Sequence, residues 1–448
     1  MNKSMDVFRK AKEMLEKHPL CNHCLGRQFA LLGHDMENHE RGEAMKAALV
    51  LEAHALVLSK RKEGERILGI LATNGFSEAA KEVMRKTKKR LKRKYMPKTC
   101  FLCENRFKIV NELVEKAVRM LRKYECRNFL VGIQLPVVVE EREDDFKAEF
   151  EVTYGENIRN EFGRIIGKEI ADRVRKGVEY KKPDVVVLVN PFKEETKIQV
   201  NPLYVAGCYR KVARGIPQSR WYCSSCRGKG CEKCDWTGTM YSESVEEIIE
   251  KPFLDATTGI KASFHASGRE DIDARMLGKG RCFVVEIVEP RKRFLDLEKI
   301  EKAVNVHGKG KVEVSDLHFA DRDVVRRLKK ADSREKEYRV VIEFEDPISG
   351  GDLRLLEEKL TNNMIRQRTP IRVSHRRADL TREKYIYEVK VKKLSPKAAE
   401  MRIRCQGGLY VKELVTGDCG RTEPSVSGIL KSKAEPIELD VLSVIMND

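Results

Sequence analysis

The sequence contains no hydrophobic run long enough to cross a membrane. None of its stretches approaches the roughly 18 consecutive apolar residues that a transmembrane helix needs. The N-terminal segment MNKSMDVFRKAKEMLEKHPL is charged and amphipathic, and it lacks the uninterrupted apolar centre of a signal peptide. Internal repeats and low-complexity tracts are also missing. We therefore expect a soluble, cytoplasmic protein that has no membrane partner.

Acidic residues are outnumbered by basic ones. The 448 residues include 88 Lys and Arg against 70 Asp and Glu, so the formal net charge is +18. The excess lies in local blocks, a distribution that suits a polyanionic partner, and nucleic acid is the leading candidate. The hydrophobic fraction of 41% is ample for buried cores, and the length indicates two to three domains of roughly 100–200 residues each.

The cysteine pattern argues against a disulfide framework. There are 13 cysteines, and the odd total together with paired C-x2-C spacing indicates metal binding in a reducing compartment. The paired residues are Cys21 and Cys24, Cys100 and Cys103, Cys223 and Cys226, and Cys231 and Cys234. The other five lack a partner at ligand spacing, and we expect small core residues at Cys126, Cys208, Cys282, Cys405 and Cys419.

Two of these pairs lie close together in WYCSSCRGKGCEKCDWTG. Only four residues separate them, and Gly228 and Gly230 can supply the sharp reversal that brings all four thiolates onto one zinc ion. Free core thiols or redox pairs are the alternative reading. The other two pairs are separated by 75 residues, so a site built from them would clasp distant parts of the chain, and the spacing alone predicts it less strongly. Four thiolates leave no open position for a catalytic water, so both sites are expected to be structural, and His23 is expected outside the ligand set.

The chain is expected to have an α+β fold in three parts. Residues 1–104 are helical and basic. Their helix SEAAKEVMRKTKKRLKRKYMPK begins at Ser77 as N-cap, and its ten basic residues within 81–98 favour RNA contact over an ordinary solvated face. Residues 105–206 mix α and β, with strands over 129–141 and 183–190 and a helix over 158–174. Residues 207–448 carry mostly antiparallel strands over 281–290, 338–347, 384–394, 401–411 and 437–446, with helices over 321–331 and 352–360.

The segment HASGREDIDARMLGKGR, residues 265–281, interleaves acids with arginines. Glu270, Asp271 and Asp273 lie among Arg269, Arg275 and Arg281, with glycines at 268, 278 and 280. The segment precedes the apolar strand RCFVVEIVEP, which indicates a loop mounted on a sheet, where reactive residues concentrate. The glycines would let a ligand approach the backbone closely. A surface ion-pair lattice and a metal site are the alternatives, although adjacent acids project differently.

The motif GRED resembles the G-R-x-D segment of the pseudouridine synthase superfamily. SGREDIDARMLGKGRCFVVEIVEPR closely resembles the archaeal and eukaryotic tRNA pseudouridine synthase family that acts in the TΨC arm, except that Cys282 stands where proline is expected. This resemblance implies that Asp271 is the nucleophile and that Glu270 and Asp273 shape the loop or face RNA. EYRVVI is similar to the family's active-site tyrosine segment, and GGLYVKELVTGDCGRTEPSVSGIL to its Tyr-x-basic segment. They imply substrate contacts by Tyr338, Tyr410 and Leu430, with a basic residue at Lys412.

The resemblance extends toward the N-terminus. FLVGIQLPVVVEERED and PDVVVLVNPFKEETKIQVNPLYVAGCYRK resemble a THUMP-type RNA-binding domain, and Cys21, Cys24, Cys100 and Cys103 occupy the places of the family's zinc site. The compact cluster resembles a feature of archaeal members. Two structural zinc ions, no organic cofactor, tRNA as partner and no obligate protein partner are therefore implied. The resemblance leaves open whether position 54, position 55 or both are modified.

The implied chemistry is consistent with these residue types. Isomerisation breaks the N1–C1′ bond of uridine and rejoins the uracil through C5, which calls for an anionic nucleophile and no cofactor. A dry site would raise the pKa of an aspartate, and a neighbouring cation would lower it, so we expect Lys412 to pair with Asp271. Arg269 is expected to contact RNA where the base is extruded, and Tyr338 and Tyr410 to hold the freed uracil. His375, Arg376 and Arg377 add a basic surface, either for RNA or as a solvated loop.

Two other classes of protein share part of this pattern. A THUMP-type tRNA thiolase or methyltransferase also combines such a domain with cysteines, but the chain has neither the S-G-G-x-D-S order nor a G-x-G-x-G methyl-donor loop. A nonenzymatic zinc-containing tRNA-binding protein would explain the charge and the cysteines. It would leave Asp271, Tyr338 and Tyr410 without a role.

Overall fold

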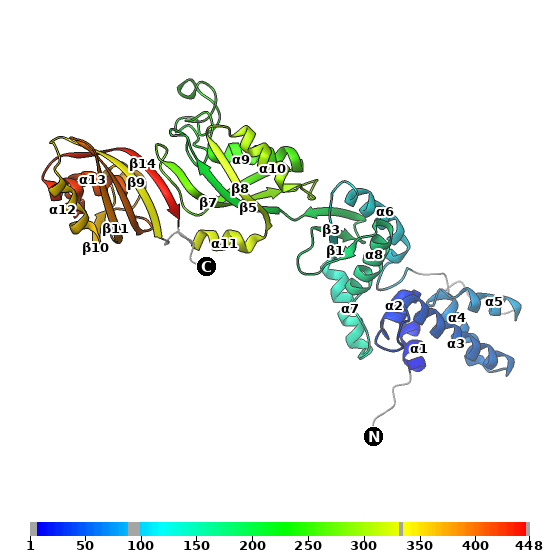
Figure 1. Cartoon of the computed structure of the whole chain (residues 1–448). Helices are drawn as coiled ribbons and strands as arrows, with labels where there is room; N and C mark the ends of the chain where they lie inside the picture. The colour runs from blue at the N-terminus through cyan, green and yellow to red at the C-terminus, as the bar shows by residue number, and fades with distance from the viewer. Residues whose placement is uncertain (1–6, 88–98, 331–334, 445–448) are drawn as a thin grey trace. The chain divides into compact units, whose positions relative to one another are not determined.

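The computed structural model describes residues 7–87, 99–330 and 335–444, which form two compact units, Met1–Asn201 and Pro202–Asp448 (Figure 1). The boundary expected at residue 206 lies inside a strand of the second unit, because residues 203–206 already pair with its sheet. No helix of the described residues is long and apolar enough to cross a membrane.

The first unit begins with a group of helices. They are α1 (Val7–Lys17), α2 (Asn22–Arg27), α3 (Asn38–Leu58), α4 (Lys62–Thr73) and α5 (Glu78–Lys86). Helices α2 and α3 touch through their backbones, since a Cβ on Gly42 would lie 2.0 Å from the carbonyl oxygen of Asn22. Ser77 caps α5 as expected, its side chain accepting the Ala80 N–H. Residues 88–98, most of the predicted basic run, lie outside the described ranges.

A small α/β layer completes the first unit. Its elements are η2 (Arg106–Ile109), α6 (Val110–Leu121), β1 (Asn128–Ile133), α7 (Val137–Glu149), α8 (Ile158–Val174), β2 (Gly177–Val178), β3 (Val185–Asn190) and β4 (Glu195–Val200). The strand order is β2-β1-β3-β4, with β1 parallel to β2 and β3 and with β4 antiparallel to β3. One hydrophobic cluster runs from Ala11 to Val200, so the helical group and the sheet share a core.

The strand predicted over residues 129–141 is wrong in its second half. It ends at Ile133, and α7 starts after Pro136, whose φ of −62° suits a helix N-terminus. Val139, Glu143 and Phe146 are buried at helical spacing, whereas Val137 and Val138 are exposed. The three consecutive valines therefore belong to a helix, and of the three only Val139 faces the core.

The second unit is built on one sheet, whose ten described strands are β5 (Leu203–Lys211), β6 (Lys261–Ala266), β7 (Arg275–Val288), β8 (Val312–Ala320), β9 (Glu335–Phe344), β10 (Asn363–Arg368), β11 (Thr381–Ser395), β12 (Ala398–Gln406), β13 (Thr422–Glu423) and β14 (Ala434–Val444). The order is β13-β10-β11-β12-β9-β14-β7-β5-β8, and β6 pairs with β7. All pairings are antiparallel except β14 with β7. The expected α+β, mostly antiparallel architecture is confirmed.

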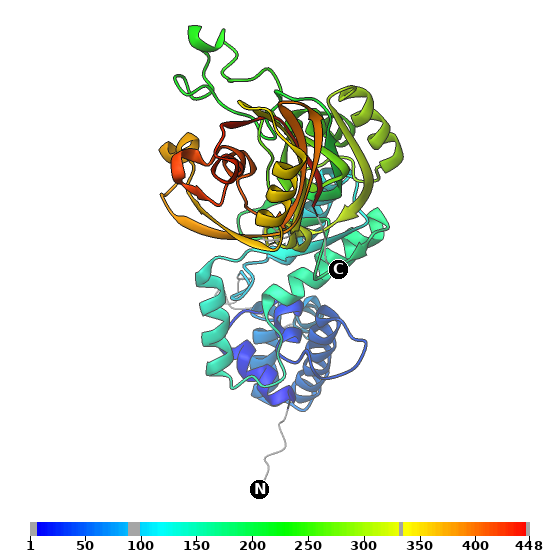
Figure 2. The same ribbon diagram turned by 60° about the vertical axis from the view of Figure 1, so that its left-hand side comes forward.

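The second unit also contains short helices between the strands of its sheet. They are η3 (Glu232–Cys234), α9 (Val245–Thr257), α10 (Leu297–His307), α11 (Arg322–Lys330), α12 (Gly350–Leu360), η5 (Ile371–Arg376), α13 (Val411–Thr416), η6 (Asp418–Gly420) and α14 (Val426–Leu430). The segment between β5 and α9, which carries the compact cysteine cluster, extends away from the sheet as a green loop (Figure 2).

Two predicted boundaries in this unit shift. The strand predicted over 401–411 ends at Gln406, because Gly408 adopts a φ of +89° and Tyr410 caps α13. The loop predicted over 265–281 is shorter, because β7 already begins at Arg275. Gly278 therefore serves the sheet and not a ligand, as a Cβ there would lie 2.0 Å from the carbonyl oxygen of Leu442 in β14.

The central strand β14 carries a buried carboxylate. Asp440 is fully buried and accepts hydrogen bonds from Arg275 of β7 (2.9 Å), Arg339 of β9 (2.9 Å) and Arg214 (2.6 Å). It thereby joins the strands on both of its sides, and the arginines hold the pKa of Asp440 below its usual range against the opposing effect of burial.

Candidate active site and cysteine clusters

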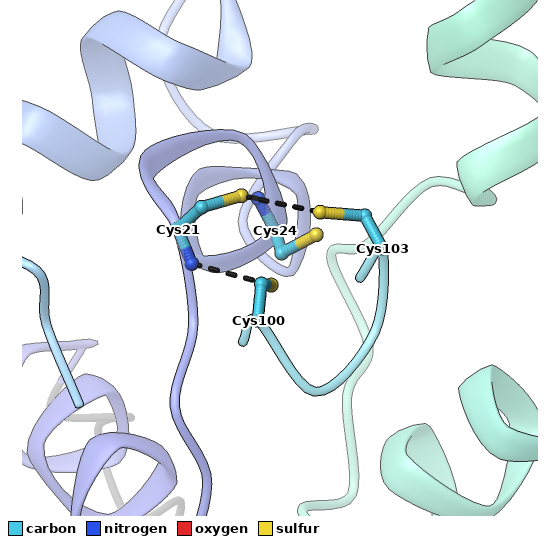
Figure 3. Close-up of side chains that lie close together, drawn as sticks. All are labelled: Cys21, Cys24, Cys100 and Cys103. Carbon is cyan, nitrogen blue, oxygen red and sulfur yellow. Dashed lines mark hydrogen bonds between the residues drawn. The ribbon is translucent and has the colours of Figure 1, made fainter. Parts of the chain in front are cut away.

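The two distant cysteine pairs meet in the first unit (Figure 3). Cys21 precedes α2, Cys24 lies within it, and Cys100 and Cys103 lie just before η2. The four sulfur atoms lie within 4.8 Å of one another, and those of Cys21 and Cys103 are 3.6 Å apart. A zinc–sulfur bond of about 2.3 Å gives a tetrahedron edge of about 3.8 Å. The donor set and spacing therefore fit a tetrahedral thiolate-bound metal.

A buried charge network supports this first cluster. Arg27 is fully buried, its Nη1 lies 3.5 Å from the sulfur of Cys24, and it bonds to Glu143 (3.0 Å) and Glu161 (2.9 Å). His23 is hydrogen-bonded to Glu161 at 2.8 Å and lies outside the set of four sulfurs, as expected. The cluster is thus connected to α7 and α8 of the α/β layer.

The compact cluster assembles in the second unit. Sulfur separations are 3.8 Å for Cys223 and Cys231, and 3.7 Å for Cys226 and Cys234, again close to a tetrahedron edge. The predicted reversal is present, since Gly228 and Gly230 have φ values of +94° and +87°. Backbone N–H groups donate to the sulfurs, for example Gly230 to Cys226 at 3.2 Å. Both clusters can therefore hold a metal ion.

The remaining cysteines only partly follow expectation. Cys126 and Cys405 are buried, but Cys419 is exposed. Cys208 and Cys282 oppose each other on β5 and β7 with their sulfurs 3.2 Å apart, a contact that sequence spacing did not indicate. The shared hydrogen bond with Cys282 raises the pKa of the Cys208 thiol, and burial adds to this effect.

A cavity of about 570 Å³ opens beside the loop between β6 and β7. The residues that line it include several predicted from the sequence to act on the substrate or beside it: Arg269, Asp271, Asp273, Tyr338, Tyr410 and Lys412. They come from this loop, from β9 and from the start of α13. Leu430 is placed elsewhere, at the end of α14, where it packs against the core of the unit and is not among the lining residues described for the cavity.

Two cations approach Asp271. The Nζ of Lys412 lies 3.5 Å from the Oδ2 of Asp271, but it donates to both oxygens of Asp273 at 2.7 and 2.6 Å. The Nη2 of Arg372 lies nearer to Asp271, at 3.2 Å, and its Nε donates to Glu413 at 2.6 Å. The pKa of Asp273 is lowered, because the bond from Lys412 outweighs partial burial, which alone would raise it.

Buried polar groups hold the loop that carries Asp271 in place. Glu270 is buried and accepts from the hydroxyl of Tyr209 (3.0 Å) and from the Nε of Arg281 (3.0 Å). Gln218 donates to the carbonyl oxygen of Gly268 at 3.0 Å. Of the two roles expected for Glu270, this geometry supports loop shaping and not contact with RNA.

Lys211 also holds this loop. Its buried Nζ donates to the backbone oxygens of Ile216 (2.8 Å), Asp271 (3.1 Å) and Ile272 (3.1 Å). Burial lowers the pKa of Lys211 to about 8. The backbone of Asp271 is therefore pinned while its side chain remains accessible, with 37% of its surface exposed.

Aromatic and basic side chains form the rest of the cavity wall. The hydroxyl of Tyr410 accepts from the Nη1 of Arg377 at 3.0 Å. The guanidinium of Arg269 lies over the ring of Trp221, 5.1 Å from its centroid. Trp221 and Arg377 also line the cavity. The lining residues include three carboxylates and five cationic side chains, the latter being Arg269, Lys336, Arg372, Arg377 and Lys412. This basic excess favours a polyanionic ligand.

Two family models match the chain. One described as "Pus10, C-terminal" matches residues 204–445, and one described as "Pus10 THUMP domain, archaeal" matches residues 113–190. Curated proteins named tRNA pseudouridine synthase Pus10 align along almost its whole length. The protein of Methanocaldococcus jannaschii is 44% identical over 97% of this chain and 94% of its own. The protein of Pyrococcus furiosus is 38% identical over 98% of each. The chain belongs to the Pus10 family.

Membership in the Pus10 family confirms the resemblance drawn from the loop motif and makes the chain an isomerase. Solved structures resemble it only distantly. The archaeal box H/ACA Nop10–Cbf5 complex matches 44% of this chain and 43% of that chain with 12% identity and a TM-score of 0.25. A pseudouridylate synthase matches 58% and 76%, with 12% identity and a TM-score of 0.22. Similarity at this level does not identify a common fold.

Three cavity or loop residues of this Pus10 protein were not found from the sequence: Lys211, Trp221 and Arg372. Lys211 and Trp221 lie at the ends of segments that the sequence did single out, and Arg372 lies just outside one. Arg372 is two residues before SHRRADLTREK, and Trp221 is two residues before the first cysteine of the compact cluster. No spacing rule links them to Asp271, because their approach depends on how separate loops fold over the sheet.

Proposed function

We propose that the protein converts uridine to pseudouridine in the TΨC arm of tRNA, at position 54, position 55 or both, with Asp271 as the nucleophile. The observation that carries this proposal is the convergence of Asp271, two cations and two tyrosines on one cavity. The relatives are named as tRNA pseudouridine synthases, and a THUMP model matches the first unit, which supports tRNA as the substrate.

Asp271 is suited to act as an anion at C1′. Isomerisation retains every atom of the base, since the N1–C1′ bond breaks, a C5–C1′ bond forms, and the proton lost from C5 is balanced by one gained at N1. No organic cofactor is needed for this balance. The hydrogen bonds from Lys211 to the adjacent backbone keep the carboxylate aimed into the cavity, which limits the cost of orientation at the reacting atom.

Two cations lie beside Asp271 and can pair with its carboxylate. Lys412 was expected in this role, and its contact at 3.5 Å is compatible with it. Arg372 makes the shorter contact and is oriented by Glu413, which is buried. We assign both residues to the nucleophile, with Arg372 as the closer partner in the absence of RNA.

Other residues on the cavity are assigned to the RNA. Tyr338 and Tyr410 hold the uracil while it is detached, by stacking and hydrogen bonding. Arg269 contacts the RNA at the extruded base or at its phosphate, which helps to offset the cost of unstacking. His375 and Arg377 are exposed nearby and supply electrostatic attraction for the backbone.

Both cysteine clusters are proposed to bind zinc. Their donor sets are four thiolates, the set typical of structural zinc, and the sulfur separations match that geometry. Zinc would hold distant segments together in the first unit and would close a single loop in the second, with no part in the isomerisation. A cytoplasmic location and independence from protein partners remain predictions from the sequence.

The two neighbouring aspartates provide a direct test, because both contact Lys412 from the same loop. Full-length wild-type, Asp271→Asn and Asp273→Asn proteins are incubated with unmodified tRNA and no cofactor, and pseudouridine is mapped along the transcript. We expect Asp271→Asn to lower kcat by at least roughly 1,000-fold while RNA affinity is retained. Asp273→Asn is expected to keep kcat within about 10-fold of wild type, because it removes only a partly exposed ion pair.

Transcripts with cytidine at position 54 or at position 55 then identify the modified site. Absence of product from the wild-type protein would refute the proposed activity and would favour a tRNA-binding protein without catalysis. Normal turnover by Asp271→Asn would instead show that another residue is the nucleophile.

A further inference from the structure

We infer that Trp221 binds a second nucleobase of the RNA, next to the uracil that Asp271 acts on. This inference rests on the proposed function. Trp221 lines the same cavity as Asp271, Tyr338 and Tyr410. The cavity of about 570 Å³ lies in the range for drug-sized ligands, which are much larger than one uracil, so room remains for a neighbouring base.

The ring of Trp221 is already engaged by a planar group whose residue also lines the cavity. The guanidinium of Arg269 lies 5.1 Å from the ring centroid. Such a position is also suitable for a nucleobase, since bases and guanidinium groups are both planar and both stack on indole. In the complex the base takes the place of the guanidinium, and Arg269 turns to a phosphate. When the base replaces the guanidinium over the ring, Arg269 can bind an RNA phosphate while the indole of Trp221 stays covered.

The indole is held in place from both sides of the compact cysteine cluster. The N–H of Met240 donates to the carbonyl oxygen of Trp221 at 2.8 Å, and Tyr222 bridges to Thr239. The ring of Tyr241 meets that of Trp221 edge to face, with centroids 5.7 Å apart. The segment that holds the compact cysteine cluster is therefore closed at its two ends, where the rings of Trp221 and Tyr241 meet. A preorganised ring loses little entropy when a base stacks on it.

The chain offers a matched spectroscopic control. It contains two tryptophans, and the second, Trp236, is 72% exposed on the same loop but does not line the cavity. The full-length Trp236→Phe protein therefore reports on Trp221 alone, and Trp221→Phe reports on Trp236 alone. Asp271→Asn is added to each so that binding is observed without turnover.

Titration with an unmodified tRNA transcript is expected to quench the emission of Trp221 by at least about half and to leave that of Trp236 nearly unchanged. In the otherwise wild-type protein, Trp221→Ala is expected to raise KM by about 10- to 100-fold with kcat within about 3-fold of wild type. Trp221→Phe should restore most of the affinity, because phenylalanine still stacks. A purely structural ring would not give this split between KM and kcat.

Two results would overturn the inference: emission of Trp221 that is unchanged at saturating tRNA, or a KM for Trp221→Ala within about 2-fold of wild type. Either could occur while the wild-type protein still forms pseudouridine, in which case the proposed function stands. Quenching of Trp221 without any pseudouridine from the wild-type protein would instead retain the base-binding site and refute the activity.

Discussion

Cys208 and Cys282 form a thiol pair that the sequence spacing conceals. They are register partners on β5 and β7, and both are partly accessible. Cys282 also stands where the family resemblance led us to expect proline, so the pair is a property of this chain and not of the shared loop motif. Its backbone carbonyl accepts from Ser267, the first residue of the loop that carries Asp271. The pair therefore lies directly behind that loop.

Oxidised glutathione is expected to convert this pair into a disulfide, with two reduced glutathione molecules released for each bond formed. A cross-link across a loop of this length stabilises by roughly 4 kcal/mol before any strain is subtracted. Mass spectrometry of a non-reduced digest should find the peptides of Cys208 and Cys282 joined, and the melting temperature of the second unit should rise. Cys282→Ala is the control and should show neither change. Recovery of both residues as alkylated thiols after oxidation would contradict the prediction.

At this scale, the residues found from the sequence are those that a motif marks. Asp271, Tyr338 and Lys412 were assigned through a resemblance, and the structure brings them to one cavity from three separate elements. Arg372 and Lys211 were missed because their side chains approach Asp271 only after folding. A buried lysine that donates to backbone oxygens leaves no pattern in the sequence.

Helix α9 contains a glutamate, Glu250, that lowers the stability of the protein when it is ionised. Glu250 is half-buried, and burial together with the charges of Glu246 and Glu247 raises its pKa to about 7 against the weaker opposing effect of Arg220 and Lys261. One of its carboxylate oxygens is buried without a hydrogen bond among the described residues. Because the native state binds this proton more tightly than the unfolded chain, the free energy of unfolding falls as the pH rises from 4.5 toward 7.

Glu250→Gln is therefore expected to stabilise the protein at pH 8 and to have little effect at pH 4.5. The gain should be on the order of 1 kcal/mol after allowance for solvent screening, or roughly 2–4 °C in melting temperature. Thermal melts followed by circular dichroism at both pH values measure it. Asp255→Asn on the same helix, where the side chain is exposed, is the matched control. A gain of equal size at both pH values would show that the charge of Glu250 is not its cause.

Elements with strong periodicity were predicted well, whereas the ends of two predicted strands were not. The helix over 158–174 agrees with α8 at both ends. The strand over 129–141 was extended too far because three valines outweighed Pro136, although proline suits the first turn of a helix better than the middle of a strand. The strand over 401–411 failed at Gly408 for a similar reason, since its positive φ ends the extended chain.

At the scale of the whole molecule, each unit contains one cysteine cluster. Binding of zinc to such a site contributes directly to the free energy of folding. In the first unit the cluster links α2 to a segment 75 residues further along the chain and lies within the unit's single core. Loss of that metal is therefore expected to unfold the first unit while the sheet of the second unit persists.

Elemental analysis should find two zinc ions in each wild-type chain. Cys100→Ser should retain about one, and calorimetry should show that only one of two transitions is lowered; Cys226→Ser should lower the other. The exposed Cys419 serves as control, and Cys419→Ser should retain both ions. Two ions in Cys100→Ser, or none in the wild-type protein, would contradict the assignment.

The position of β14 has a consequence during synthesis on the ribosome. This strand lies between β7 and β9, which are both translated earlier, so each half of the sheet has an open edge until residues 434–444 emerge. Leu439 and Val441 of β14 also line the cavity, and Asp440 supplies the charge that joins Arg275 to Arg339. A nascent chain that already contains Asp271, Tyr338 and Lys412 therefore cannot assemble the cavity, and the enzyme becomes competent only as translation of the sheet ends.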